Sequence, residues 1–262
     1  QYGSGPSPVI PQFIRGTDAL PYNEQTNKIT RASQGTDWLD EIFRTAPIQN
    51  YDLSVQGGGE KSRYMMSQGY QNQQGIQLNT GFERYVTRLN TEFDVNKNVR
   101  LGEHMNVSYT NTLSQNQFGL AMSAPPLVPV YDEEGNFAGS GPSTAAGLSN
   151  TNNPVAELER GKDNFNKNIR VIGDAYAEIS FLEDFVAKSS IGISYNHRLQ
   201  NLITRLNPEA PEPRATNTLR ELTSDAGSWV WSNTLRWNKD LGDHKIALLG
   251  GCLLYTSDAA DE

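Results

Sequence analysis

The sequence of 262 residues lacks the marks of several protein classes. Its one cysteine, Cys252, excludes a disulfide scaffold and a cysteine-rich metal site. No stretch approaches the roughly 18 apolar residues of a membrane-spanning helix, and the longest candidate, 124–131, contains three prolines. Lys and Arg number 22 against 30 Asp and Glu, and the formal charge of -8 argues against a protein that mainly coats nucleic acid. A β-barrel would pass all of these tests.

A period of two dominates the pattern that is present. In 99–109, apolar residues stand at the odd positions and polar or small residues at the even ones, with Glu103 as the one exception. Alternation of this kind predicts a half-buried β-strand. It recurs, or begins, in 51–55, 64–70, 85–93, 169–181, 188–196, 229–237 and 246–250. We therefore expect an all-β fold with about eight antiparallel strands in a meander.

The predicted connections differ in length in a regular way. Short ones at 57–61, 94–98, 182–184 and 239–243 alternate with long ones at 71–80, 110–167 and 198–226. Short and long connections then lie at opposite ends of the sheet, which is typical of outer-membrane barrels. Many strands reach about ten residues, close to the tilted span of a bilayer. The pattern favours part of a transmembrane β-barrel.

The sequence divides into three segments. Residues 1–50 are expected to form an extracellular loop with one short helix at 36–45, which Thr36 or Asp37 caps and Pro47 ends. Residues 51–251 hold the partial barrel. Residues 252–262 resemble a translated transposon adapter of the kind used for sequencing libraries, so we expect them to be a non-native tail.

Several motifs in succession resemble one family. They include Thr36-Asp-Trp-Leu-Asp-Glu-Ile-Phe-Arg-Thr45, Gly57-Gly-Gly-Glu-Lys-Ser-Arg-Tyr64 and Gly75-Ile-Gln-Leu-Asn-Thr-Gly81, followed by segments 125–139, 153–156 and 231–235. Together they are similar to the SusC/RagA-type TonB-linked outer-membrane transporters, and the similarity covers most of 30–250.

The resemblance implies a fold and a function beyond the alternation itself. Such transporters form a 22-stranded barrel closed by an internal plug, so these residues would supply an early part of the barrel in the outer membrane. They take up oligosaccharides or peptides with energy passed on by TonB, and a SusD-like lipoprotein covers the outside. Contacts with the TonB complex are expected from other parts of such a protein. The expected partners also include outer-membrane lipid but no nucleic acid.

Two alternatives remain open at this stage. Eight strands can close a small outer-membrane barrel with an adhesive or structural role. A soluble, secreted all-β module that binds glycans would also show alternating strands. No arrangement of catalytic residues, cofactor site or metal site stands out, so we expect no enzyme activity and no cofactor.

The polar positions of the strands are the candidate functional residues. If the apolar side chains face lipid, the charged ones line the lumen or contact the plug. They are Arg88, Glu92, Arg100, His104, Arg170, Glu178, Lys188 and Arg236. Candidates for the interfacial aromatic girdles are Tyr51, Tyr109, Tyr195, Trp229, Trp231 and Trp237. In the longest loop, substrate or lid contacts are expected from Tyr131, Asn136, Phe137, Asn152 and Asn153.

Overall fold

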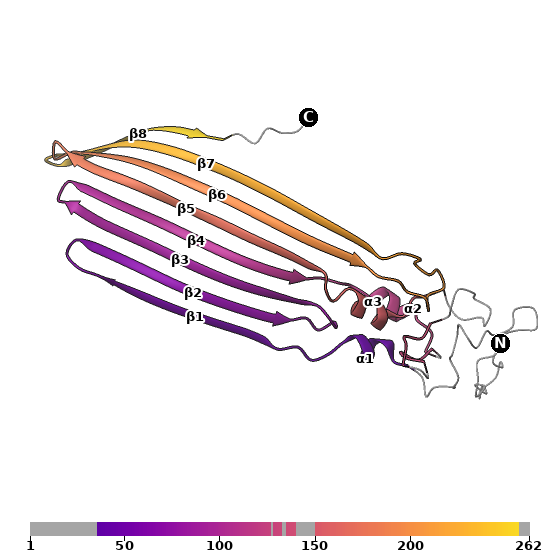
Figure 1. Cartoon of the computed structure of the whole chain (residues 1–262). Coiled ribbons are helices and arrows are strands. Elements are labelled where there is room, and N and C mark those ends of the chain that lie inside the picture. Colours follow the sequence, from indigo (N-terminus) through magenta and orange to yellow (C-terminus); the bar gives the residue numbers. More distant parts are fainter. Residues whose placement is uncertain (1–35, 127, 133–134, 140–149, 257–262) are drawn as a thin grey trace, which may run out of the picture.

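A computed structural model describes residues 36–126, 128–132, 135–139 and 150–256, and its main feature is one antiparallel sheet (Figure 1). Eight strands follow one another in chain order from β1 to β8, which confirms the predicted meander. Their bounds are β1 Ile48–Gly58, β2 Ser62–Gln74, β3 Gly81–Asn96, β4 Val99–Leu113, β5 Phe165–Phe181, β6 Phe185–Thr204, β7 Thr218–Leu241 and β8 His244–Tyr255. β8 thus extends into the segment expected to be a non-native tail.

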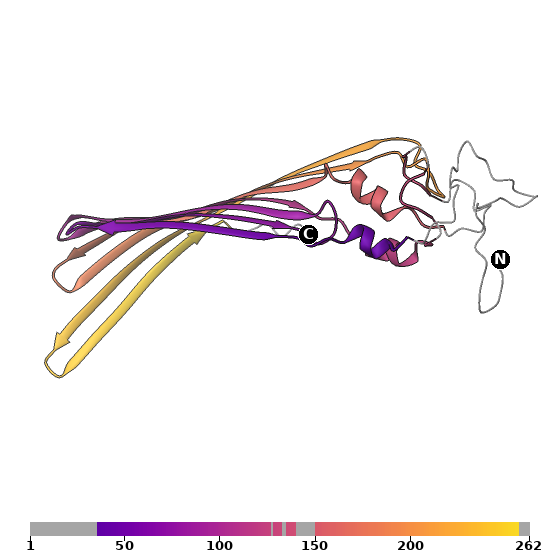
Figure 2. The same cartoon turned by 90° about the horizontal axis from the view of Figure 1, so that it is seen from below.

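The two ends of the sheet differ as the sequence predicts. Tight turns join the strands at one end, and the helices gather at the other (Figures 1 and 2). The connection predicted at 198–226 is wrong in length, because β6 and β7 stay paired until Thr204 meets Thr218. In the outer part of β7, 218–226, apolar and charged residues both occur at odd and at even positions, so the sequence shows no alternation there.

Three short helices lie at the end with the long connections: α1 Trp38–Ile42, α2 Phe118–Ser123 and α3 Pro154–Arg160. The Asp37 carboxylate caps α1 by accepting from the backbone N–H of Leu39 at 3.0 Å. The observed helix, Trp38–Ile42, is shorter than the helix predicted at 36–45. It ends early because the chain becomes extended at Phe43 and pairs with Gln77 of the β2–β3 connection. None of the described helices is long and apolar enough to cross a membrane.

The helices and loops enclose the hydrophobic core at the end of the sheet. Its buried side chains are Trp38, Ile42, Ala121, Val128, Val130, Ala138, Val155 and Leu158. These residues come from the segment before β1 and from the β4–β5 connection, so the core joins parts of the chain that are far apart in sequence. The helices contact one another, and within the described ranges none of them packs over either face of the sheet.

One face of the sheet, here called the apolar face, exposes many large apolar side chains. Leu53 is 70% exposed, and the other large apolar side chains of this face include Val55, Met66, Leu101, Ile191, Ile193, Trp229, Trp231 and Leu235. The register places them on one side, as in Val55 opposite Met66 and Ile191 opposite Trp231. A contiguous apolar surface of this extent marks a contact with lipid or protein rather than with water.

The helix core gives a first prediction. Leu158 is 0% exposed, so Leu158→Ala leaves a cavity and should lower the stability of the helix cluster by about 2–5 kcal/mol. Amide hydrogen exchange in α1 and α3 should become faster while exchange in β5 stays unchanged. Met122→Ala is the matched control, because Met122 lies in the same cluster but is 62% exposed. Equal effects of both changes would contradict a packed core at Leu158.

Candidate functional site

All eight residues expected to face a lumen or plug lie on one face of the sheet, here called the polar face. The register shows this directly: Arg100 stands opposite Glu178 on β5, and Glu178 stands opposite Lys188 on β6. The same alternation places Arg88, Glu92, His104, Arg170 and Arg236 on this side. What these side chains face in the complete protein stays a prediction.

Glu92 is the centre of a connected group on the polar face. Its carboxylate pairs with Arg63 at 3.0 Å and accepts a hydrogen bond from the Tyr176 hydroxyl at 2.9 Å. Arg100 lies 3.9 Å from the same carboxylate and donates to Asp94 at 2.6 Å. We call Arg63, Glu92, Asp94, Arg100, Tyr176 and Lys188 the Glu92 cluster. It joins β2, β3, β4, β5 and β6 near the ends that carry the short turns.

Tyr176 occupies the middle of this cluster because Gly102 stands opposite it. A Cβ atom added at Gly102 would overlap the Tyr176 ring, so only glycine leaves room for the ring to lie across β4. From there Tyr176 reaches Glu92. Its ring also lies 3.8 Å from the Lys188 ammonium group and stacks on His104 with 5.8 Å between ring centroids.

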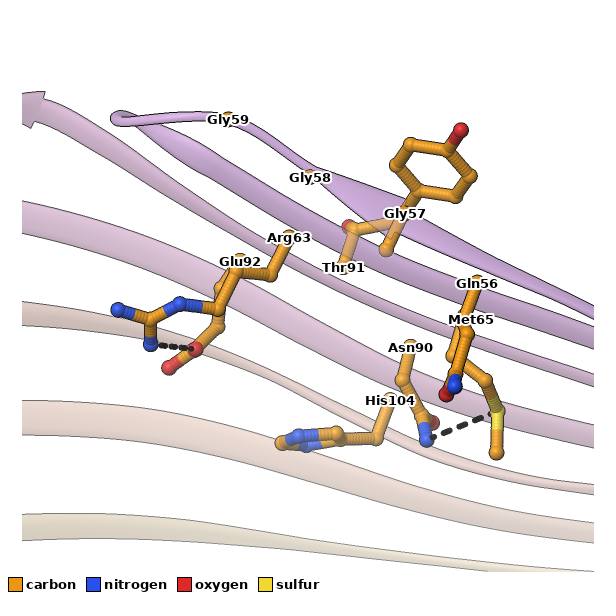
Figure 3. A pocket seen from close by; sticks show the side chains of 11 residues that line it. Gln56, Gly57, Gly58, Gly59, Arg63, Met65, Asn90, Thr91, Glu92 and His104 are labelled. Atoms are coloured by element: carbon orange, nitrogen blue, oxygen red, sulfur yellow. Dashed lines mark hydrogen bonds and ion pairs between the residues drawn. The ribbon is translucent and has the colours of Figure 1, made fainter.

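Next to the cluster lies a groove of about 530 Å³ on the polar face (Figure 3). Gln56, Asn90 and His104 point into it, and Gly57–Gly59 leave its rim without side chains. The Asn90 amide contacts the Met65 sulfur at 3.8 Å. The groove therefore offers amide, imidazole and thioether groups beside the Arg63–Glu92 ion pair. Such groups hydrogen-bond to polar ligands or to protein segments.

The remaining predicted residues of the polar face lie outside this cluster. Arg88 lines a second, smaller hollow with Asp52 and Arg84, while Arg170 and Arg236 are exposed elsewhere on the face. Sequence reasoning missed Arg63, Asp94 and Tyr176. Arg63 and Asp94 lie just outside the segments in which alternation was recognised. Tyr176 was missed because an aromatic residue at a polar position gives no charge signal.

Aromatic side chains form two rows on the apolar face. Tyr51, Tyr70, Tyr85 and Tyr109 stand in register across β1–β4, with neighbouring ring centroids 6.3, 4.8 and 6.2 Å apart. Near the short turns, Phe181, Phe185 and Trp237 form a second row. Tyr195 and Phe185 are ten residues apart on β6. At 3.3 Å per residue and a 45° tilt, roughly 23 Å separates them along the membrane normal, close to the height of a barrel's apolar band.

The expected girdle residues divide between these rows. Tyr51 and Tyr109 belong to the tyrosine row, and Tyr195 lies beside it on β6, opposite Val171. Trp237 belongs to the second row. Trp229 and Trp231 lie between the rows, opposite Ile193 and Ile191.

The loop residues expected to contact a substrate fall into two groups. Tyr131 is 53% exposed and stacks on Phe137, with 5.2 Å between ring centroids, at a turn that also exposes Asn136. Asn152 is half-buried beside Glu157. Asn153 differs from the expectation, because it is only 2% exposed. Its amide donates to Val130 and Ala138, and its oxygen caps α3.

Two ion pairs fasten the β4–β5 connection to the β6–β7 connection. Arg160 of α3 makes a bidentate contact with Glu209 at 2.6 and 2.7 Å, and both side chains are largely buried. Arg214 donates to Glu157 at 2.8 Å. The Glu159 carboxylate of α3 accepts hydrogen bonds from the exposed Lys162 and from Asn79. These two hydrogen bonds hold the pKa of the Glu159 carboxyl below its ordinary value.

Known proteins resemble this arrangement in sequence and fold. The chain is 25% identical to the TonB-dependent receptor P26 of Formosa agariphila over 93% of its length, which is 26% of that protein. It is 29% identical to the TonB-dependent receptor SusC of Bacteroides thetaiotaomicron over 64% of its length, or 19% of SusC. Among solved structures, the RagAB peptide importer in its closed-closed state matches 84% of the chain with a TM-score of 0.67 and 22% identity. No family model matches the chain.

The ordered motifs, the open meander and these relatives agree. The chain is similar in sequence to TonB-dependent receptors that include SusC, and it shares the fold of the RagA-type transporters. Receptors of this type are β-barrel proteins of the outer membrane, so the sheet is a section of a barrel wall in that membrane. The chain spans about a fifth to a quarter of the length of the relatives it matches.

The Glu92 cluster gives a prediction for this receptor. Gly102→Ala forces the Tyr176 ring away from Glu92 and should destabilise this part of the sheet by about 1–3 kcal/mol, as overpacking does. Urea unfolding of the full-length receptor in detergent measures the effect. Gly227→Ala is the control, because Gly227 also faces a tyrosine across a strand pair but its added Cβ would lie 3.8 Å from Tyr195. If neither substitution changes the free energy of unfolding, the tight fit at Gly102 is contradicted.

The loop ion pairs give another prediction. Arg160→Ala leaves the buried Glu209 carboxylate without its partner and should destabilise the joined loops by about 3–5 kcal/mol. Limited proteolysis in the 205–217 connection should then become much faster. Lys162→Ala removes an exposed partner of Glu159 and should change proteolysis little. Equal protection in both variants would show that the Arg160–Glu209 pair does not hold the two loops together.

Proposed function

We propose that the complete receptor takes up oligosaccharides or peptides across the outer membrane, using energy passed on by TonB and working with a SusD-like lipoprotein on the outer surface. The observation that carries this proposal is the division of one sheet into two faces of opposite character. The apolar face exposes Leu53 and its neighbours, and the polar face holds the Glu92 cluster. A membrane barrel needs this division, because lipid contacts its outside while its inside lines a polar passage.

The polar face has the chemistry of a passage wall. Arg63, Arg100 and Lys188 stand against Glu92 and Asp94, so the cluster carries a formal charge of only about +1 while it presents many hydrogen-bonding groups. The adjoining groove adds the amides of Gln56 and Asn90. This composition suits contact with polar solutes, and with a plug that fills the barrel, better than selection of ions of one sign. We assign the eight candidate residues, Arg88 to Arg236, to the inside of the barrel together with the rest of the polar face.

The substrate classes are proposed from separate observations. The matched solved structure is that of a peptide importer, which makes peptides one candidate class. The exposed Tyr131–Phe137 stack and the neighbouring Asn136 make oligosaccharides the other, because sugars bind aromatic rings and amides. Both features lie on a loop held by a rigid sheet, where binding residues are common.

The alternatives fit the structure less well. In a closed eight-stranded barrel β1 would pair with β8, whereas in the described residues the sheet runs from β1 to β8 and its two edges stay apart (Figure 1). A soluble glycan-binding module would cover its apolar face, yet Leu53, Ile191 and Trp231 are exposed. Both observations favour a wall segment of a larger barrel.

Uptake by the full-length receptor tests the proposal. Cells that express it should accumulate fluorescent oligosaccharides or peptides, and collapsing the inner-membrane ion gradient with an ionophore should abolish accumulation, because TonB would lose its energy source. Cells without the receptor are the control. Uptake that survives the ionophore would indicate a passive pore, and a full-length protein that stays soluble without detergent would contradict the membrane placement.

A further inference from the structure

Among the carboxylates on the apolar side, Glu103 lies between the two aromatic rows, on the part of the face that a membrane barrel turns toward lipid. Glu103 breaks the alternation of β4 and points to the apolar side, in register with Thr91 on β3 and Ala175 on β5. Its carboxylate accepts one hydrogen bond, from the Thr91 hydroxyl at 3.1 Å. Within the described ranges no cationic side chain pairs with it. An ionised group in this position is costly unless a cation from outside the sheet meets it.

Glu103 borders a hollow of about 560 Å³ on the apolar face. Small side chains form its floor: Ala175, Ala177 and Ser189. Phe93 and Leu101 form one wall, and Ile191 and Trp231 form the other. Trp231 donates its indole N–H to the Ser189 hydroxyl at 3.0 Å, which fixes that wall. The hollow thus joins an apolar trough to a carboxylate and a hydroxyl.

The depth of Glu103 suits a lipid headgroup. Val99 begins β4 directly after the short turn, and Glu103 is the fifth residue of the strand. At 3.3 Å per residue and a tilt near 45°, Glu103 lies roughly 9 Å above the turn along the membrane normal. The headgroup region is about 5–8 Å thick on each side of a bilayer, so with the turn at the membrane surface Glu103 lies just inside the hydrocarbon. A charged headgroup and the start of its acyl chain would both be within reach.

We propose that this hollow binds an ethanolamine phospholipid, with the ammonium group on Glu103 and an acyl chain between the Phe93–Leu101 and Ile191–Trp231 walls. The ammonium group has three N–H donors and a positive charge, which match the free carboxylate oxygen of Glu103. Choline has the charge but no N–H donor, and glycerol headgroups leave the lipid anionic. The inference rests on the membrane placement of the apolar face and is independent of which substrate is transported.

Native mass spectrometry of the full-length, delipidated receptor tests this site. The receptor is titrated with an equal mixture of phosphatidylethanolamine, phosphatidylcholine and phosphatidylglycerol of the same chain length. The wild-type protein should prefer phosphatidylethanolamine over phosphatidylcholine by about fivefold, the effect of one ion pair near the surface. Glu103→Gln should remove the preference. Glu221→Gln, on β7 at the far end near the long connections, should keep it.

A second variant separates charge from shape. Ala177→Leu fills the hollow from a position opposite Leu101 rather than Glu103, so it should reduce the binding of all three lipids while any remaining preference persists. Heat-dependent mobility on gels verifies that each variant is a folded barrel. An unchanged preference in Glu103→Gln overturns the proposal. So does a wild-type protein that binds no lipid because a second copy covers the hollow. Because the assay reads lipid binding rather than uptake, a failed transport experiment leaves the result intact.

Discussion

Everything in this molecule depends on the unbroken antiparallel pairing of the strands. Inside a membrane the backbone has no water to bond with, so each N–H and C=O must find its partner in a neighbouring strand. The pairing also fixes which side chains share a face, and a slip of one residue would exchange the faces of a whole strand. The tyrosine row from Tyr51 to Tyr109 therefore exists only because three strand pairs keep their register. Lipid contact, polar lining and aromatic rows are consequences of one register.

Different interactions stabilise the two ends of the sheet. At the short turns, the chain reverses and the polar face is tied together locally by the Glu92 cluster. At the other end the strands leave the apolar band, and stability comes from the helix core around Ile42 and Leu158 and from the Arg160–Glu209 pair. That end is built like a small soluble domain, with apolar residues inside and ion pairs at its margin. The same chain is thus packed with apolar residues outward in its sheet and inward in its loops.

The sequence predicts the strands and their faces better than it predicts the helices and loops. A period of two survives wherever lipid and a polar interior select opposite faces, so all eight strands and the face of every candidate charge could be predicted. The outer lengths of β6 and β7 could not, because apolar and charged residues at 218–226 occur at both odd and even positions. The end of α1 was missed because it is set by pairing of Phe43 with a residue of a distant connection, Gln77. The burial of Asn153 could not be predicted, because it comes from a helix cap and from contacts with the carbonyls of Val130 and Ala138.

Residues that break the alternation carry the most specific information. Tyr176 is an aromatic residue at a polar position, and the absence of a side chain at Gly102 lets it link Glu92 to Lys188. Glu103 is a carboxylate at an apolar position, and it borders a hollow floored by Ala175 and Ala177. In both places a small residue lies opposite the exception on the neighbouring strand. A pattern that forms the wall of a barrel needs no such pairs. Each exception, together with its small partner, therefore makes a contact that the regular pattern cannot make.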